Sequence, residues 1–241
     1  MTNPMERWTG RTAPALAASL SCRSYGTLDV ITDSERRSLR PIGMTAHEAA
    51  VRTGRLLVGL LPLPGIRIFQ GVRSPVAGTP PVPHVVSVGT HLVFVESVAW
   101  PAGRYAIATA GQIHCDGVYT GQSVQSLIAT VRHWQETLPA DYAVSALVVV
   151  HSVNDGELVL PCPDDSGIGW ARPSDAVPRI RSCMPPGRQS PGMRAVAALV
   201  AATIDVRDSP GNRLTLTARD SPPDPSAPAP GSGEPGSYTG V

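Results

Sequence analysis

The chain has 241 residues, of which 42% are hydrophobic and 5% aromatic, and it carries a net charge of +1. This length allows one sizeable domain with extensions or two small domains, and no apolar run approaches the roughly 20 residues needed to span a bilayer. All 20 basic residues are arginine, which excludes the standard P-loop because that motif requires a lysine.

Charge and cysteine use restrict the partners and the compartment. Residues 42–206 hold eleven arginines and eleven acids, so the central region lacks the basic excess of a duplex-binding domain. We therefore expect weak binding to nucleic acid at most, or a protein partner, and no membrane association. The four cysteines, at positions 22, 115, 162 and 183, form no C-x-x-C pair and no zinc-binding spacing. They are typical of reduced thiols in a cytoplasmic protein.

The two ends of the chain differ from its middle in composition. Residues 1–41 mix Pro, Gly, Ser, Thr and Arg without a sustained period, and we predict a flexible N-terminal arm. Residues 209–241 hold seven prolines and five glycines among 33 residues, so they bury too little apolar surface to offset the entropy of ordering. The sequence thus predicts a folded domain over residues 42–206 and a disordered Pro/Gly-rich tail over residues 207–241.

The domain is predicted to begin with a helix and a strand. Thr45 is followed three residues later by Glu48, and this capping box satisfies backbone N–H groups at a helix start. Small and apolar residues then follow at helical spacing until Pro62 ends the helix. Residues 66–72 form the first predicted strand.

Two hairpins are predicted next. Residues 85–88 and 92–95 are short apolar strands on either side of a Gly-Thr turn, which is the pattern of a β-hairpin. Residues 104–109 and 112–118 form a second predicted hairpin that turns at an Ala-Gly pair.

Helices and a central strand complete the predicted domain. Residues 124–138 place apolar side chains on one helical stripe, and residues 143–150 form a valine-rich run that is typical of a strand covered on both faces. A short strand is predicted at 156–160. Residues 193–204 are almost wholly apolar, so we expect a buried helix packed on the sheet. This order predicts an α/β fold with a mixed β-sheet sandwiched by helices.

The first hairpin ends in an acidic residue, Glu96, which suggests a metal-dependent nuclease site of the PD-(D/E)xK type. In such a site an aspartate on one strand and an acid on the next hold Mg²⁺, which polarises the phosphate and activates a water. A lysine two residues after the acid stabilises negative charge. A glutamate on the preceding helix often supports the metal.

The chain resembles the nuclease-related domain (NERD) family over residues 44–160. The matching features are the small-residue helix with Glu48, the hairpin 84–96, Trp100 and Gly103 after it, the turn at Asp116-Gly117, and the helix 121–138 that leads into strand 143–150. The resemblance implies a restriction-endonuclease-like core. It also implies that Glu48 is the helix acid of the site and Glu96 the acid of the second strand.

Two groups of the implied site are missing. Pro83 stands where the resemblance places the aspartate, and Val98 stands where it places the lysine. A single carboxylate would hold Mg²⁺ poorly, because the ion requires hard oxygen ligands in near-octahedral geometry. We therefore expect Glu96 and Glu48 to be the remnant of a catalytic site in a protein without a cofactor.

The main hypothesis is thus a catalytically inactive domain that is retained as a binding or interaction module. The alternative is a working DNA or RNA nuclease with a rearranged site that uses Mg²⁺ or Mn²⁺. Its candidate metal ligands are Glu96, Glu48 and Asp116, to which a histidine could be added for a softer metal such as Zn²⁺.

The histidines available to such a site are His84 and His91 on the first hairpin and His114 on the second. We expect His84 and His91 to lie at strand ends, where an exposed histidine needs no metal to explain it. A third hypothesis, an α/β domain unrelated to nucleases, would be favoured if the hairpin 84–96 did not lie beside the helix that bears Glu48.

Overall fold

The structure is a computed structural model that describes residues 23–34, 37–74, 76–162, 167–183 and 193–203. The predicted tail over 207–241 and residues 1–22 of the predicted arm lie outside the described residues.

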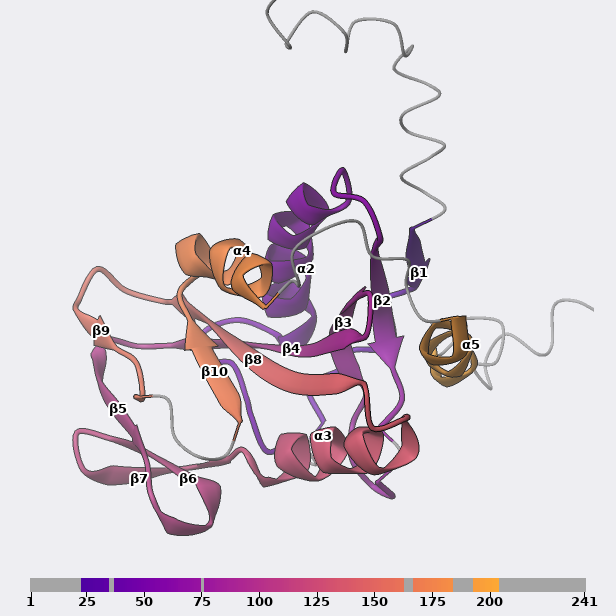
Figure 1. The fold of residues 1–241 in the computed structure, drawn as a ribbon. Coiled ribbons are helices and arrows are strands. Elements are labelled where there is room, and N and C mark those ends of the chain that lie inside the picture. The colour runs from indigo at the N-terminus through magenta and orange to yellow at the C-terminus, as the bar shows by residue number, and fades with distance from the viewer. Residues whose placement is uncertain (1–22, 35–36, 75, 163–166, 184–192, 204–241) are drawn as a thin grey trace, which may run out of the picture. The chain divides into compact units, whose positions relative to one another are not determined.

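A six-stranded mixed sheet forms the centre of the fold (Figure 1), with the strand order β1-β2-β3-β4-β8-β10. Strands β2, β3 and β4 are antiparallel neighbours, whereas β1 pairs in parallel with β2, and β8 pairs in parallel with both β4 and β10. The strands are β1 (Ser24–Gly26), β2 (Ile66–Val72), β3 (Val82–Val88), β4 (His91–Trp100), β8 (Ala143–Ser152) and β10 (Ile168–Ala171).

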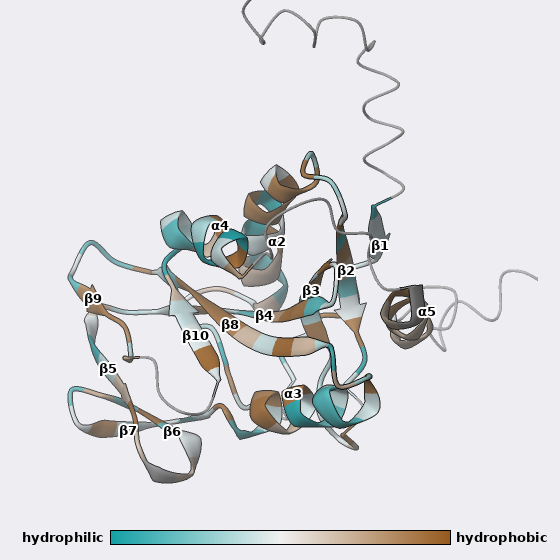
Figure 2. Cartoon of the chain, viewed as in Figure 1, coloured by the Kyte–Doolittle hydropathy of each residue, from teal (hydrophilic) through white to brown (hydrophobic). Residues whose placement is uncertain are grey.

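The hairpin of β3 and β4 is confirmed, and so is the central position of β8. Gly89 has a φ of +56° in the turn, a conformation that glycine adopts without steric cost. All seven residues of β3 and nine of the ten in β4 are buried. Both faces of these strands are therefore covered, which explains their near-continuous apolar sequence (Figure 2).

Helices cover both faces of the six-stranded sheet (Figure 1). Helices α2 and α4 pack with an apolar cluster around Val95, on one face. Helices α3 and α5 pack with a second cluster around Phe94, on the other face. The helices are α2 (Ala46–Leu57), the one-turn η2 (Val58–Leu60), α3 (Gln125–Thr137), α4 (Pro173–Ser182) and α5 (Met193–Ala202). The predicted α/β architecture with a mixed sheet between helices is confirmed.

A second, four-stranded sheet has the order β7-β6-β5-β9. Its strands are β5 (Gly103–Ile107), β6 (Gln112–Cys115), β7 (Val118–Ser123) and β9 (Leu158–Val159), and the turn η3 (Thr109–Gly111) joins β5 to β6. The predicted second hairpin is therefore extended by a third strand, β7, and α3 begins at Gln125, one residue after its predicted start. The strand expected over 156–160 is only two residues long.

The second half of the predicted N-terminal arm is part of the domain, which corrects the prediction of a flexible arm over 1–41. Strand β1 pairs with β2, and Ile31, Arg37 and Leu39 are buried. These residues are ordered by contacts with distant parts of the chain, so no local period reveals them. Two further elements were not predicted from the sequence: β10, which is short and contains a glycine, and α4, which is short and contains Pro178.

The predicted capping box of α2 is confirmed. Thr45 is the N-cap, its Oγ1 accepts the backbone N–H of Glu48 at 3.0 Å, and Glu48 Oε2 accepts the N–H of Thr45 at 2.8 Å. We expect Thr45→Ala to lower the free energy of unfolding by about 1 kcal/mol, because a backbone N–H loses its acceptor. Urea denaturation measures this change. Ser182→Ala, at the end of α4, is the control for loss of a hydroxyl, and an equal loss of stability in both variants would contradict the capping role.

None of the described helices is both long and apolar enough to cross a bilayer.

Candidate functional site

Glu96 lies within β4, on the face of the sheet that α3 covers. Side chains alternate along a strand; Phe94 and Val98 belong to the cluster on the α3 side, whereas Val95 belongs to the cluster under α2. Glu96 is 8% exposed. A carboxylate at this depth requires a partner, because burial of an unpaired charge is costly.

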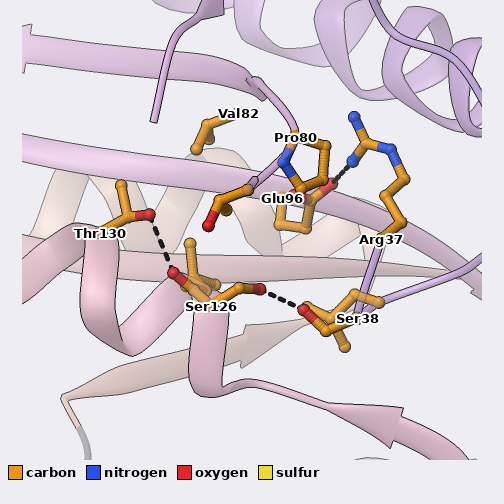
Figure 3. A pocket seen from close by; sticks show the side chains of 10 residues that line it. Arg37, Ser38, Pro80, Val82, Glu96, Ser126 and Thr130 are labelled. Atoms are coloured by element: carbon orange, nitrogen blue, oxygen red, sulfur yellow. Dashed lines mark hydrogen bonds and ion pairs between the residues drawn. The ribbon is translucent and has the colours of Figure 1, made fainter. Parts of the chain in front are cut away.

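The partner of Glu96 is Arg37, from the segment between β1 and α2. Arg37 Nη1 lies 3.1 Å from Glu96 Oε1, and the Arg37 side chain is 3% exposed. Its other N–H groups donate to backbone carbonyls, Nε to Thr32 and Nη2 to Pro81, both at 3.1 Å. The guanidinium is thus held by three acceptors, and Figure 3 shows it pointing toward the Glu96 carboxylate.

Little space remains beside this ion pair. The adjoining cavity has a volume of about 10 Å³, which is room for one water molecule at most. Ser126 and Thr130 of α3 line it: the Ser126 hydroxyl hydrogen-bonds to Ser38, and Thr130 Oγ1 donates to the Ser126 carbonyl at 2.8 Å (Figure 3). A phosphate group or a hydrated metal ion does not fit beside Glu96 in this arrangement.

Burial and the ion pair act on the pKa of Glu96 in opposite directions. Burial raises the pKa, while the Arg37 guanidinium and the backbone N–H of Ser97, 3.1 Å from Oε1, oppose the rise. Because arginine does not release its proton at working pH, the two charges are matched only while Glu96 is ionised. Arg37 is therefore the group that makes a buried carboxylate tolerable here.

Glu48 does not join Glu96. It is an exposed residue of α2, which covers the opposite face of the sheet from α3. Hydrogen bonds from the backbone and the hydroxyl of Thr45 lower the pKa of Glu48. Its carboxylate is used by the capping box, so this position has a complete structural explanation.

The two positions that the resemblance associates with the aspartate and the lysine hold no polar group. Pro83 is buried within β3, and Val98 is a fully buried member of the cluster on the α3 side. Among the described residues, the neighbourhood of Glu96 therefore offers one carboxylate, paired with an arginine, and several hydroxyls.

Asp116 lies in the turn between β6 and β7 with a φ of +51°. Its Oδ1 accepts the backbone N–H of Arg104 at 3.1 Å. His114 Nδ1 is 3.3 Å from the carbonyl of Gly117 in the same turn. In the part of the chain that the structure describes, no three side chains of His, Cys, Asp or Glu come together as a metal site.

His84 is fully buried under α2, which corrects the expectation of an exposed histidine at a strand end. Among the described residues, neither of its ring nitrogens has a hydrogen-bond partner, and Nε2 lies 3.0 Å from where a Cβ on Gly54 would be. Burial lowers the pKa of His84 to about 3. On the same side of the sheet, His151 Nε2 hydrogen-bonds to Thr53 Oγ1 at 2.9 Å. His91, at the start of β4, is partly exposed.

Arg37 was not predicted as part of this site. It precedes Glu96 by 59 positions and lies in a segment without a helical or strand period, so no spacing connects the two. The available signal was indirect: an acid within an apolar strand requires a buried cation, and lysine is absent from the chain.

The hairpin of β3 and β4 does lie beside α2, which packs against both strands. A hairpin remote from this helix would have favoured an α/β domain unrelated to nucleases, and the structure does not show that arrangement. Comparison of the chain with protein-family models, with curated proteins and with solved structures gives no match.

Proposed function

We propose that this protein is a catalytically inactive, nuclease-related domain that serves as a binding or interaction module. The observation that carries the proposal is the buried pair of Glu96 and Arg37, beside which a cavity of about 10 Å³ is too small for a metal ion with its water ligands. The hairpin of β3 and β4, which bears Glu96 and lies next to a helix with a small-residue face, supports a restriction-endonuclease-like core as its origin.

The chemistry of the pair explains the loss of activity in this proposal. The Arg37 guanidinium supplies positive charge beside the acid, as a metal would, but it has no coordination position in which to lower the pKa of an attacking water. Pro83 and Val98 provide neither a second carboxylate nor an ammonium group. A nuclease step would therefore lack its metal, its activated water and its charge stabilisation.

Composition favours a protein over a nucleic acid as the partner. The region 42–206 balances eleven arginines with eleven acids, whereas phosphate binding depends on a local excess of cationic side chains. The free thiols of Cys115, Cys162 and Cys183 support a cytoplasmic location, where such thiols stay reduced.

Metal binding and DNA cleavage test the proposal together. We expect no saturable heat when the protein is titrated with Mn²⁺ or Mg²⁺ by calorimetry, because Glu96 is already paired. We also expect no nicking of supercoiled plasmid and no degradation of single-stranded DNA in the presence of either metal. The same result is expected for Glu96→Gln and for Glu136→Gln, a control at an exposed position of α3.

One pattern of results would establish the alternative instead. Binding of Mn²⁺ and DNA cleavage that disappear in Glu96→Gln, but persist in Glu136→Gln, would mean that Arg37 moves aside and that the site is a rearranged nuclease centre.

A further inference from the structure

A larger cavity lies on the other face of the sheet from Glu96, between β8, β10 and the C-terminal half of α4. Its volume is about 450 Å³, which is within the range of small-molecule binding sites. The residues that line it are Val93, Ser145, Ala146, Leu147, Gly167, Gly169, Arg179, Ile180, Ser182 and Cys183.

The floor of the cavity is apolar. Val93, Leu147 and Ile180 belong to the cluster that α2 and α4 cover. Gly169 of β10 keeps the space over this floor open, because a Cβ at this position would approach Leu147 Cδ1 to 3.2 Å. The floor therefore accepts an apolar chain or ring of modest size.

The described part of the rim has one charged side chain, and it is a cation. Arg179 is an exposed residue of α4, and the lining residues that the structure describes include no acid. Among the residues that the structure describes, the Arg179 guanidinium forms no ion pair. Arginine binds carboxylates through two parallel N–H groups, so the rim favours an anionic group over a neutral or cationic one.

We infer that this cavity binds a small amphipathic anion, with its apolar part on the floor formed by Val93, Leu147 and Ile180 and its carboxylate against Arg179. The inference goes beyond the proposed function and does not depend on it, because the cavity shares no residue with the surroundings of Glu96. Metal binding at Glu96 would leave it untouched.

Calorimetric titration with decanoate, below its micelle concentration, tests the inference on the full chain. We expect saturable binding that Arg179→Gln weakens about tenfold, the size of effect typical of a lost charge-assisted hydrogen bond. Arg181→Gln, the next exposed arginine of the same helix, is the matched control and should bind as the wild type does. Decylamine, with the same chain and the opposite charge, should bind at least about tenfold more weakly than decanoate.

Alkylation of Cys183 by iodoacetamide locates the ligand independently. Cys183 lines the cavity, whereas the exposed Cys162 does not, so decanoate should slow the modification of Cys183 relative to that of Cys162, as measured by mass spectrometry. The inference is overturned by absent saturation, by equal affinity in Arg179→Gln and Arg181→Gln, by equal binding of decylamine, or by an unchanged ratio of the two alkylation rates.

Discussion

Replacement of Arg37 by methionine is expected to lower the free energy of unfolding by about 3–5 kcal/mol at pH 8, because it leaves the buried Glu96 carboxylate without its cation. The pair is 3.1 Å apart, and the Arg37 side chain is 3% exposed, so solvent screens the lost interaction very little. Urea denaturation, with the midpoint and the m-value fitted together, measures the change. Arg132→Met, at an exposed position of α3, should change stability by no more than about 0.5 kcal/mol.

The double variant Arg37→Met/Glu96→Leu separates the cost of a lone charge from the value of the pair. Each single variant leaves one buried charge, whereas the double variant leaves none and should regain most of the lost stability. A remainder of about 1 kcal/mol for each of the carbonyls of Thr32 and Pro81 is expected, since both lose the Arg37 donor. A double variant as unstable as the sum of the single variants would show that the two side chains are not coupled.

The pH dependence of the Arg37→Met variant identifies the uncompensated group. Burial already raises the pKa of Glu96, and removal of the opposing guanidinium should raise it further. A carboxyl with a raised pKa in the folded state contributes full stability below its unfolded pKa and loses it as pH increases. The stability lost in Arg37→Met should therefore be smaller at pH 5 than at pH 8.

Local patterns in the sequence were sufficient for the elements that their own residues stabilise. The capping box fixed the start of α2 at Thr45, and the apolar runs around Gly89 fixed the central hairpin, because both signals lie within a few residues. Strands β1 and β10 were not predicted, because three or four residues are too few to show an alternation of apolar and polar side chains. Their positions are set by pairing with β2 and β8 instead.

The candidate site shows that local patterns also fail to reveal contacts between single residues that are distant in the sequence. The sequence identified Glu96 as the chemically unusual residue of β4. The resemblance implied that Glu48 belongs to the same site, but helix order does not reveal which face of the sheet a helix covers. Arg37 was predicted to lie in a flexible arm. The contact between Arg37 and Glu96 is the central feature of the site, and it joins two residues 59 positions apart that no motif connects.

Replacement of His84 by leucine is expected to make the protein more resistant to acid. The folded-state pKa of His84 is about 3, whereas an unfolded chain binds a proton there below about pH 6.5. Between these two values the unfolded state holds more protons, so stability is lost as pH falls, at about 1.4 kcal/mol per pH unit. At pH 5 the penalty from this residue is about 2 kcal/mol, and His84→Leu should remove it.

Urea denaturation at pH 7.5 and at pH 5 gives the stability that the wild type and His84→Leu each lose over this interval. The effect of His84 is the difference between these two losses. At pH 7.5 the variant should be as stable as the wild type or more stable. Both ring nitrogens of His84 are buried without a hydrogen-bond partner among the described residues, and an apolar group of similar size has no such cost. His133→Gln, at an exposed position of α3, controls for the loss of one imidazole. An equal loss of stability between pH 7.5 and pH 5 in His84→Leu and in the wild type would mean that His84 takes up a proton in the folded state. Water would then have to enter between α2 and the sheet. The close approach of the His84 ring to Gly54 of α2 argues against such entry.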